Sequence, residues 1–71
     1  MSVATNIIED VHVELCQAEA NLTLADGAAG DLSTACKQAA INDLSTARRK
    51  LEQATIAIEQ ELYGKEALHA G

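Results

Sequence analysis

The sequence has no proline, phenylalanine or tryptophan, a single tyrosine and only four glycines in 71 residues. Without proline, nothing in the chain forces a helix to break. Apolar residues make up 48% of the chain, but many are alanines, which contribute little buried area each. A chain this short with so little bulk is marginally stable alone, which favours a single domain that associates with a second subunit.

Basic residues are also few, with five Lys and Arg against eleven Asp and Glu and a net charge of −6. This balance argues against direct nucleic-acid binding and favours a basic protein surface as a partner. The start lacks a basic segment followed by an apolar one, and no run of 18 apolar residues occurs, so we expect no membrane partner. Two cysteines do not make a disulfide framework, and a cytoplasmic location with reduced thiols is expected.

The stretch from Asp31 to Tyr63 carries the strongest pattern in the chain. Apolar residues recur in it at steps of three and four, which is typical of one side of an α-helix: Cys36, Ala40, Leu44, Ala47, Leu51, Ala54, Ile58 and Leu62. We predict a helix over about residues 32–63, which would span roughly 50 Å. Gly64 is expected to end it, leaving residues 64–71 as a tail.

A shorter helix is predicted over about residues 6–26, with Asn6 and Glu9 as a capping box and residues 1–5 as a frayed lead-in. Its main apolar stripe has the spacing of a coiled-coil seam: Ile8, Val11, Leu15, Ala18, Leu22 and Ala25. A second apolar set lies nearly opposite: Val13, Cys16, Ala20 and Leu24. Two apolar sides predict two neighbours, one of them in another chain.

The segment 26–31 joins the helices, with Gly27 as a left-handed cap and Asp31 or Ser33 as the next N-cap. So short a turn predicts an all-α antiparallel two-helix hairpin, in which Val11 lies near Ala47. The first helix would end level with about Ala54, so the apolar residues beyond it would overhang without cover. That surplus predicts a homodimer with a four-helix arrangement.

Residues that lie off the main stripes or in the overhang are the candidate dimer or partner interface. On the first helix these are Val13, Cys16 and Leu24, and on the second they are Ile41, Arg48, Ile56, Ile58, Leu62 and Tyr63. Tyr combines contact area with a polar tip and is a common interface anchor. The basic run Arg48–Lys50 either holds phosphate or an acidic partner patch, or is a solvated surface that pairs with Glu52 and with Glu residues of a neighbouring chain.

No residue set predicts catalysis, a metal site or a cofactor. His12 and Cys16 have a spacing that can hold a metal, but Cys36 and His69 would have to complete the site from distant places in the hairpin. A nucleophile would need a neighbouring base and an orienting acid, and a two-helix hairpin offers no deep pocket. We therefore expect a protein that is not an enzyme.

The pentapeptide at Asp31–Ala35 recurs at Asp43–Ala47. An offset of twelve residues turns the second copy by about 120° on a helix, so the copies do not share a face. The repeat is either a coincidence of composition or a duplicated binding turn. A structural alternative is that Asp43 caps a fresh helix after a kink at Asn42.

From Asn6 to Tyr63, the short acidic hairpin without catalytic residues resembles small host-takeover proteins of bacteriophages. It is most similar to the helical-hairpin quorum-sensing anti-activators of Pseudomonas phages. The resemblance implies a homodimer that binds and blocks a host regulator such as a LuxR-type transcription factor. A second resemblance, in Arg49–Ala54, is to phage hairpin sponges that sequester cyclic nucleotides, although no aromatic residue is present there to stack on a base. A coiled-coil subunit of a larger assembly is the third alternative.

Overall fold

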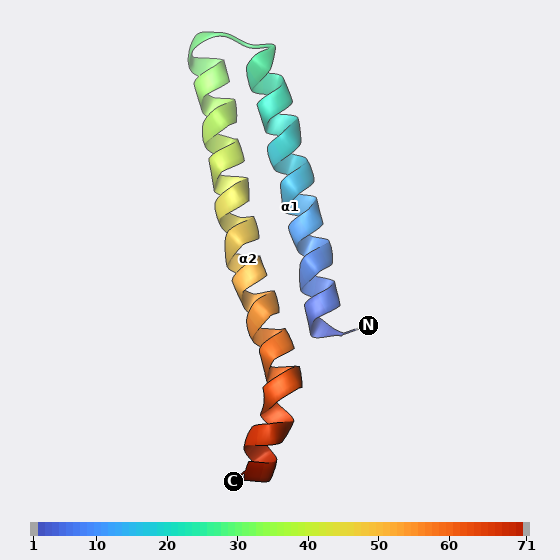
Figure 1. Cartoon of the computed structure of the whole chain (residues 1–71). Coiled ribbons are helices and arrows are strands. Elements are labelled where there is room, and N and C mark those ends of the chain that lie inside the picture. The colour runs from blue at the N-terminus through green and yellow to red at the C-terminus, as the bar shows by residue number, and fades with distance from the viewer. Residues whose placement is uncertain (1, 71) are drawn as a thin grey trace.

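Two helices joined by a three-residue turn form an antiparallel hairpin in the computed structural model (Figure 1). The structure describes the chain from residue 2 to residue 70, with side chains from residue 2 to residue 64. Helix α1 is Val3–Asp26 and helix α2 is Gly30–Ala70. The predicted all-α hairpin is therefore confirmed, and a four-helix dimer stays a prediction.

The hairpin is a thin rod rather than a compact domain. Its extents are 59 × 20 × 10 Å and its radius of gyration is 17.3 Å, against about 11 Å for a compact chain of this length. Figure 1 shows why the rod is long: the C-terminal part of α2 continues well past the start of α1. The predicted overhang is present.

Helix α1 begins earlier than expected. Ser2, with extended backbone angles, is its N-cap, and its side-chain oxygen accepts a hydrogen bond from the Thr5 backbone N–H at 3.1 Å. This bond satisfies one of the free N–H groups at the helix start. The predicted capping box at Asn6 and Glu9 is therefore wrong, and residues 3–5 belong to the helix.

The turn also differs from its prediction in detail. Gly27 caps α1 with φ −92°, in the right-handed region, and the left-handed conformation belongs to Gly30, with φ +61°. Glycine adopts this conformation without the steric cost that a Cβ would bring. Ser33 Oγ then donates to the Ala25 carbonyl oxygen at 3.0 Å, which connects the first turn of α2 to the last turn of α1.

Helix α2 is continuous from Gly30 to Ala70. It passes through Asn42 and Asp43, so Asp43 does not start a new helix, and through Gly64, so the predicted stop there is wrong. A Cβ at Gly64 would meet nothing within 4 Å, and a glycine in a helix weakens it by only about 1 kcal/mol relative to alanine. One unfavourable residue is not enough to end a helix.

The contact between the helices is made by small residues. The buried residues, each 2–6% exposed, repeat every seven positions on both helices. We call them the alanine seam: Ala4, Val11, Ala18 and Ala25 on α1, and Ala40, Ala47 and Ala54 on α2. The bond between Ser33 and Ala25 sets the register, and seven-residue steps from it place Val11 beside Ala47, in agreement with the predicted pairing. The leucines of the predicted stripes are not in the seam.

Candidate binding surfaces

One face of the hairpin carries polar contacts between the two helices. Asn21 Nδ2 donates to Asp43 Oδ2 at 2.8 Å, and Lys50 Nζ donates to Glu14 Oε1 at 3.3 Å, where it forms an ion pair. Both pairs are partly buried. On α1 the two members are seven residues apart, and the same is true on α2. The two pairs therefore follow one another along the same side of the rod. We call these four residues the polar face.

The opposite face is apolar. Ile8, Leu15 and Leu22 are each one residue beyond the α1 line that contains Glu14 and Asn21, and a one-residue step turns 100° around a helix. That step crosses the alanine seam to its other side. On α2, the same one-residue step from the line that contains Asp43 and Lys50 leads to Leu44, Leu51 and Ile58. Because the helices are antiparallel, both steps lead to the same face of the hairpin.

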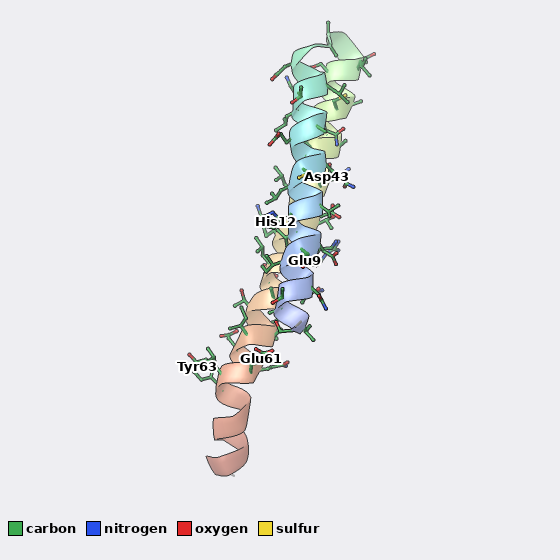
Figure 2. The ribbon with its side chains drawn as sticks, turned by 90° about the vertical axis from the view of Figure 1, so that its right-hand side faces the viewer. Glu9, His12, Asp43, Glu61 and Tyr63 are labelled. Atoms are coloured by element: carbon green, nitrogen blue, oxygen red, sulfur yellow. The ribbon has the colours of Figure 1, made fainter. Side chains whose placement is uncertain are left out.

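These six residues form what we call the leucine face: Ile8, Leu15, Leu22, Leu44, Leu51 and Ile58. Each is 36–45% exposed, and Ile58 is the member that also belongs to the end of α2 near the start of α1. Figure 2 shows the division of the rod, with Asp43 on one side and His12, at the edge of the leucine face, on the other. The sequence prediction placed all six in stripes and expected the hairpin to bury all of them except Ile58, which it predicted to lie uncovered. The signal that separates them is the pair of parallel seven-residue repeats, one of alanine and one of leucine.

Two predicted interface residues of α1, Val13 and Cys16, lie on its side away from α2, and both are exposed. Leu24, 61% exposed, instead lines a surface hollow at the turn together with Leu32 and Cys36 of α2. Val13 and Cys16 agree with the expected second apolar side of α1, and the role of all three residues in an interface stays a prediction.

The predicted interface residues of α2 fall into two groups. Ile41 and Arg48, seven residues apart and both exposed, lie along the outer edge of the leucine face. The other four, Ile56, Ile58, Leu62 and Tyr63, are 44–59% exposed near or beyond the end of α1.

Tyr63 and Ile56 line a second hollow with Glu59, Gln60 and Gly64. Figure 2 shows Tyr63 projecting from the part of α2 that α1 does not cover. The last contact of α1 with this region is a hollow that Val3 lines with Ala57, Gln60 and Glu61. We call the part of α2 after Ala57 the overhang.

The basic run divides between the two faces. Lys50 is engaged with Glu14 across the polar face, whereas Arg48 and Arg49 are exposed. The partner of Lys50 is Glu14 of the same chain, whereas the sequence predicted Glu52 or a Glu residue of a neighbouring chain. The ion pair leaves the run with one cation fewer for an external phosphate.

The repeated pentapeptide occupies two different environments. Ser33 of the first copy bonds to α1, whereas its counterpart Ser45 is exposed. Asp43 of the second copy accepts from Asn21, whereas its counterpart Asp31 lies in the exposed first turn of α2. The copies do not share a face, as the twelve-residue offset predicts.

Within the described residues, no group of three or more His, Cys, Asp or Glu side chains is placed to hold a metal ion. Cys16 and Cys36 are free thiols, and the side chain of His69 lies outside the described residues. Neither helix, over its described length, has the length and apolar character that a membrane crossing requires. Comparison of the chain with protein-family models, curated proteins and solved structures gives no significant match.

Proposed function

We propose that this chain is a small non-enzymatic binding protein that acts as a homodimer and docks on a bacterial regulator to block it. The observation that carries the proposal is where the bulk of the apolar side chains lies. Seven residues, six of them alanine, are buried in the hairpin, whereas fourteen large apolar side chains in the part with described side chains are exposed. Exposed apolar surface on this scale is typical of interaction sites.

The overhang is the surface that we assign to the regulator. It combines Leu62 and Tyr63, both 59% exposed, with the carboxylates of Glu59 and Glu61. An apolar patch next to acidic groups fits a protein surface that is apolar and basic. The DNA-binding surface of a transcription factor is basic because it neutralises phosphates. A LuxR-type transcription factor is therefore the target class that we propose, and occlusion of its DNA-binding surface is the mode of action.

The test uses a purified LuxR-type transcription factor and its labelled operator DNA. We expect the protein to displace the factor from DNA in a fluorescence anisotropy titration. Replacing Leu62 and Tyr63 together by Ser should abolish the displacement. The matched control is Leu32→Ser, at an equally exposed position near the turn. Equal activity of both variants would exclude the overhang as the site, and no displacement by the wild-type protein across several such factors would exclude the target class.

A structural subunit of a larger assembly is the second candidate, since the 59 Å rod is long for 71 residues. It predicts open-ended self-association that grows with concentration, whereas the binding function predicts a discrete dimer. Light scattering over a range of concentrations separates the two. The cyclic-nucleotide sponge has less support, because Lys50 is already paired with Glu14.

A further inference from the structure

The accessible surface of the chain is too large for a self-sufficient monomer. It measures 5329 Å², whereas a compact monomer of 7.5 kDa exposes about 4,200 Å². The excess is about 1,100 Å², and a standard protein interface covers about 800 Å² on each partner. The surplus surface is thus of the size that one further helical hairpin would cover.

The leucine face is the continuous part of that surface. Its six residues run along both helices at the same seven-residue spacing, and their exposures are nearly equal. The register set by Ser33 and Ala25 brings Leu15 level with Leu44 and Ile8 level with Leu51. These levels are pairs of large side chains, as in the layers of a four-helix bundle.

The two long edges of the leucine face carry opposite charge at the end near the turn. Along α1, the line one step outward contains His12, Glu19 and Asp26. Along α2, Lys37 continues the leucine line toward the turn at the level of Leu22, and Arg48, one step outward, is at the level of His12. A surface with an acidic edge and a basic edge is complementary to a copy of itself only when each edge meets the other.

We propose that a second copy of this chain covers the leucine face, with both turns at the same end and α1 of each copy on α2 of the other. The two-fold axis then runs parallel to the rod. Every α1 residue of the leucine face meets the partner's α2 line at its own level, so that Leu15 faces the second copy's Leu44. Lys37 of each copy then lies level with the segment between Glu19 and Asp26 of the other. This inference deepens the dimer of the proposed function and rests on it.

The alternative orientation, with the turns at opposite ends, is less favourable. It lays α1 against α1 and α2 against α2, so Lys37 no longer meets the line of Glu19 and Asp26. The orientation with both turns together makes that pairing and also places both overhangs at one end of the dimer.

The orientation can be measured by the distance between spin labels at the turn. Ala29 lies in the turn and is exposed, so Ala29→Cys, in a chain with Cys16→Ser and Cys36→Ser, accepts one label per copy. We expect a distance comparable to the 20 Å width of the rod. A distance of about 40 Å or more would overturn the orientation, because turns at opposite ends are that far apart even when the two-fold axis lies at the level of Leu15.

The face can be tested by dimer dissociation in analytical ultracentrifugation. Leu51→Gln should weaken the dimer by at least about tenfold, because each dimer contains the change twice and a tenfold loss is a small free-energy change. Leu24→Gln is the matched control at an exposed position outside the leucine face and should leave dissociation unchanged. A stronger effect of Leu24→Gln, or a monomeric wild-type protein at high concentration, would refute the proposal. Both experiments use the pure protein alone, so their failure is distinct from a failure to block a transcription factor.

Discussion

Replacing Ala18 by leucine should destabilise the hairpin far more than the same change two residues away. Ala18 is 3% exposed at the middle of the alanine seam, facing Ala40 of the other helix in the register described above. Ala20 is also in α1 but lies about 200° away around the helix, and it is exposed. Both variants exchange Ala for Leu within α1, so composition and helix propensity change equally in the two. A difference in stability between them therefore reports how closely the helices pack at Ala18.

The size of the effect follows from what the extra carbons displace. Inserting large groups into a packed contact costs about 1–3 kcal/mol, and a chain of this length has only about 4–11 kcal/mol of stability in all. The helices could relieve the overlap only by moving apart. That movement would stretch the 2.8 Å bond between Asn21 and Asp43 and the 3.3 Å pair between Lys50 and Glu14.

Thermal unfolding followed by circular dichroism provides the assay. Each kcal/mol shifts the melting temperature by about 4–8 °C for a domain of this size, so Ala18→Leu should melt several degrees or more below the wild type. Ala20→Leu should melt close to the wild type. All proteins must be compared at one concentration, because association shifts apparent stability. Equal melting of the two variants would refute a close-packed alanine seam.

Two further predictions concern the backbone and the polar face. Gly30→Ala should lower stability by about 1–2 kcal/mol, because φ +61° is strained for any residue with a Cβ, whereas Gly64→Ala should raise it by up to about 1 kcal/mol. Urea denaturation of both variants checks the opposite signs, and a stabilising Gly30→Ala would contradict the turn geometry. Lys50→Glu and Glu14→Lys should each destabilise by up to about 1 kcal/mol, and the double exchange should recover most of the loss. Additive losses in the double variant would show that the two side chains do not interact.

The overall fold was predictable because its signals are strong and local. The glycines of the segment 26–31 predict the turn, and the apolar repeat of residues 31–63 predicts the long helix. The helix ends were predicted less well. Both errors, at Asn6 and at Gly64, came from reading one residue as a boundary when the neighbouring sequence supports a continuous helix. A Ser2 cap two residues into the chain carries little pattern of its own.

The binding surface was only half predictable. A helical stripe that contains both alanine and leucine does not say which of the two faces the neighbouring helix. Here the answer depends on how closely the helices approach. Alanines allow the helices to approach closely, so Leu15 and Leu44 lie at one edge of the contact. At the opposite edge, Glu14 and Lys50 form an ion pair between the helices. The ion pair of Glu14 and Lys50 connects residues 36 positions apart in sequence, which a local pattern does not reveal.

The seven-residue spacing has a consequence for how this molecule can change its length. Deleting Ser45 would turn the rest of α2 by about 100° and bring Arg48 to the place that Ala47 now occupies. A whole seven-residue block added to each helix would keep the alanine seam, the polar face and the leucine face aligned and would lengthen the molecule by about 10 Å. Loss or gain of single residues is therefore excluded along most of both helices, and lineages of this chain should differ in size by complete repeats or by changes at its turn and ends.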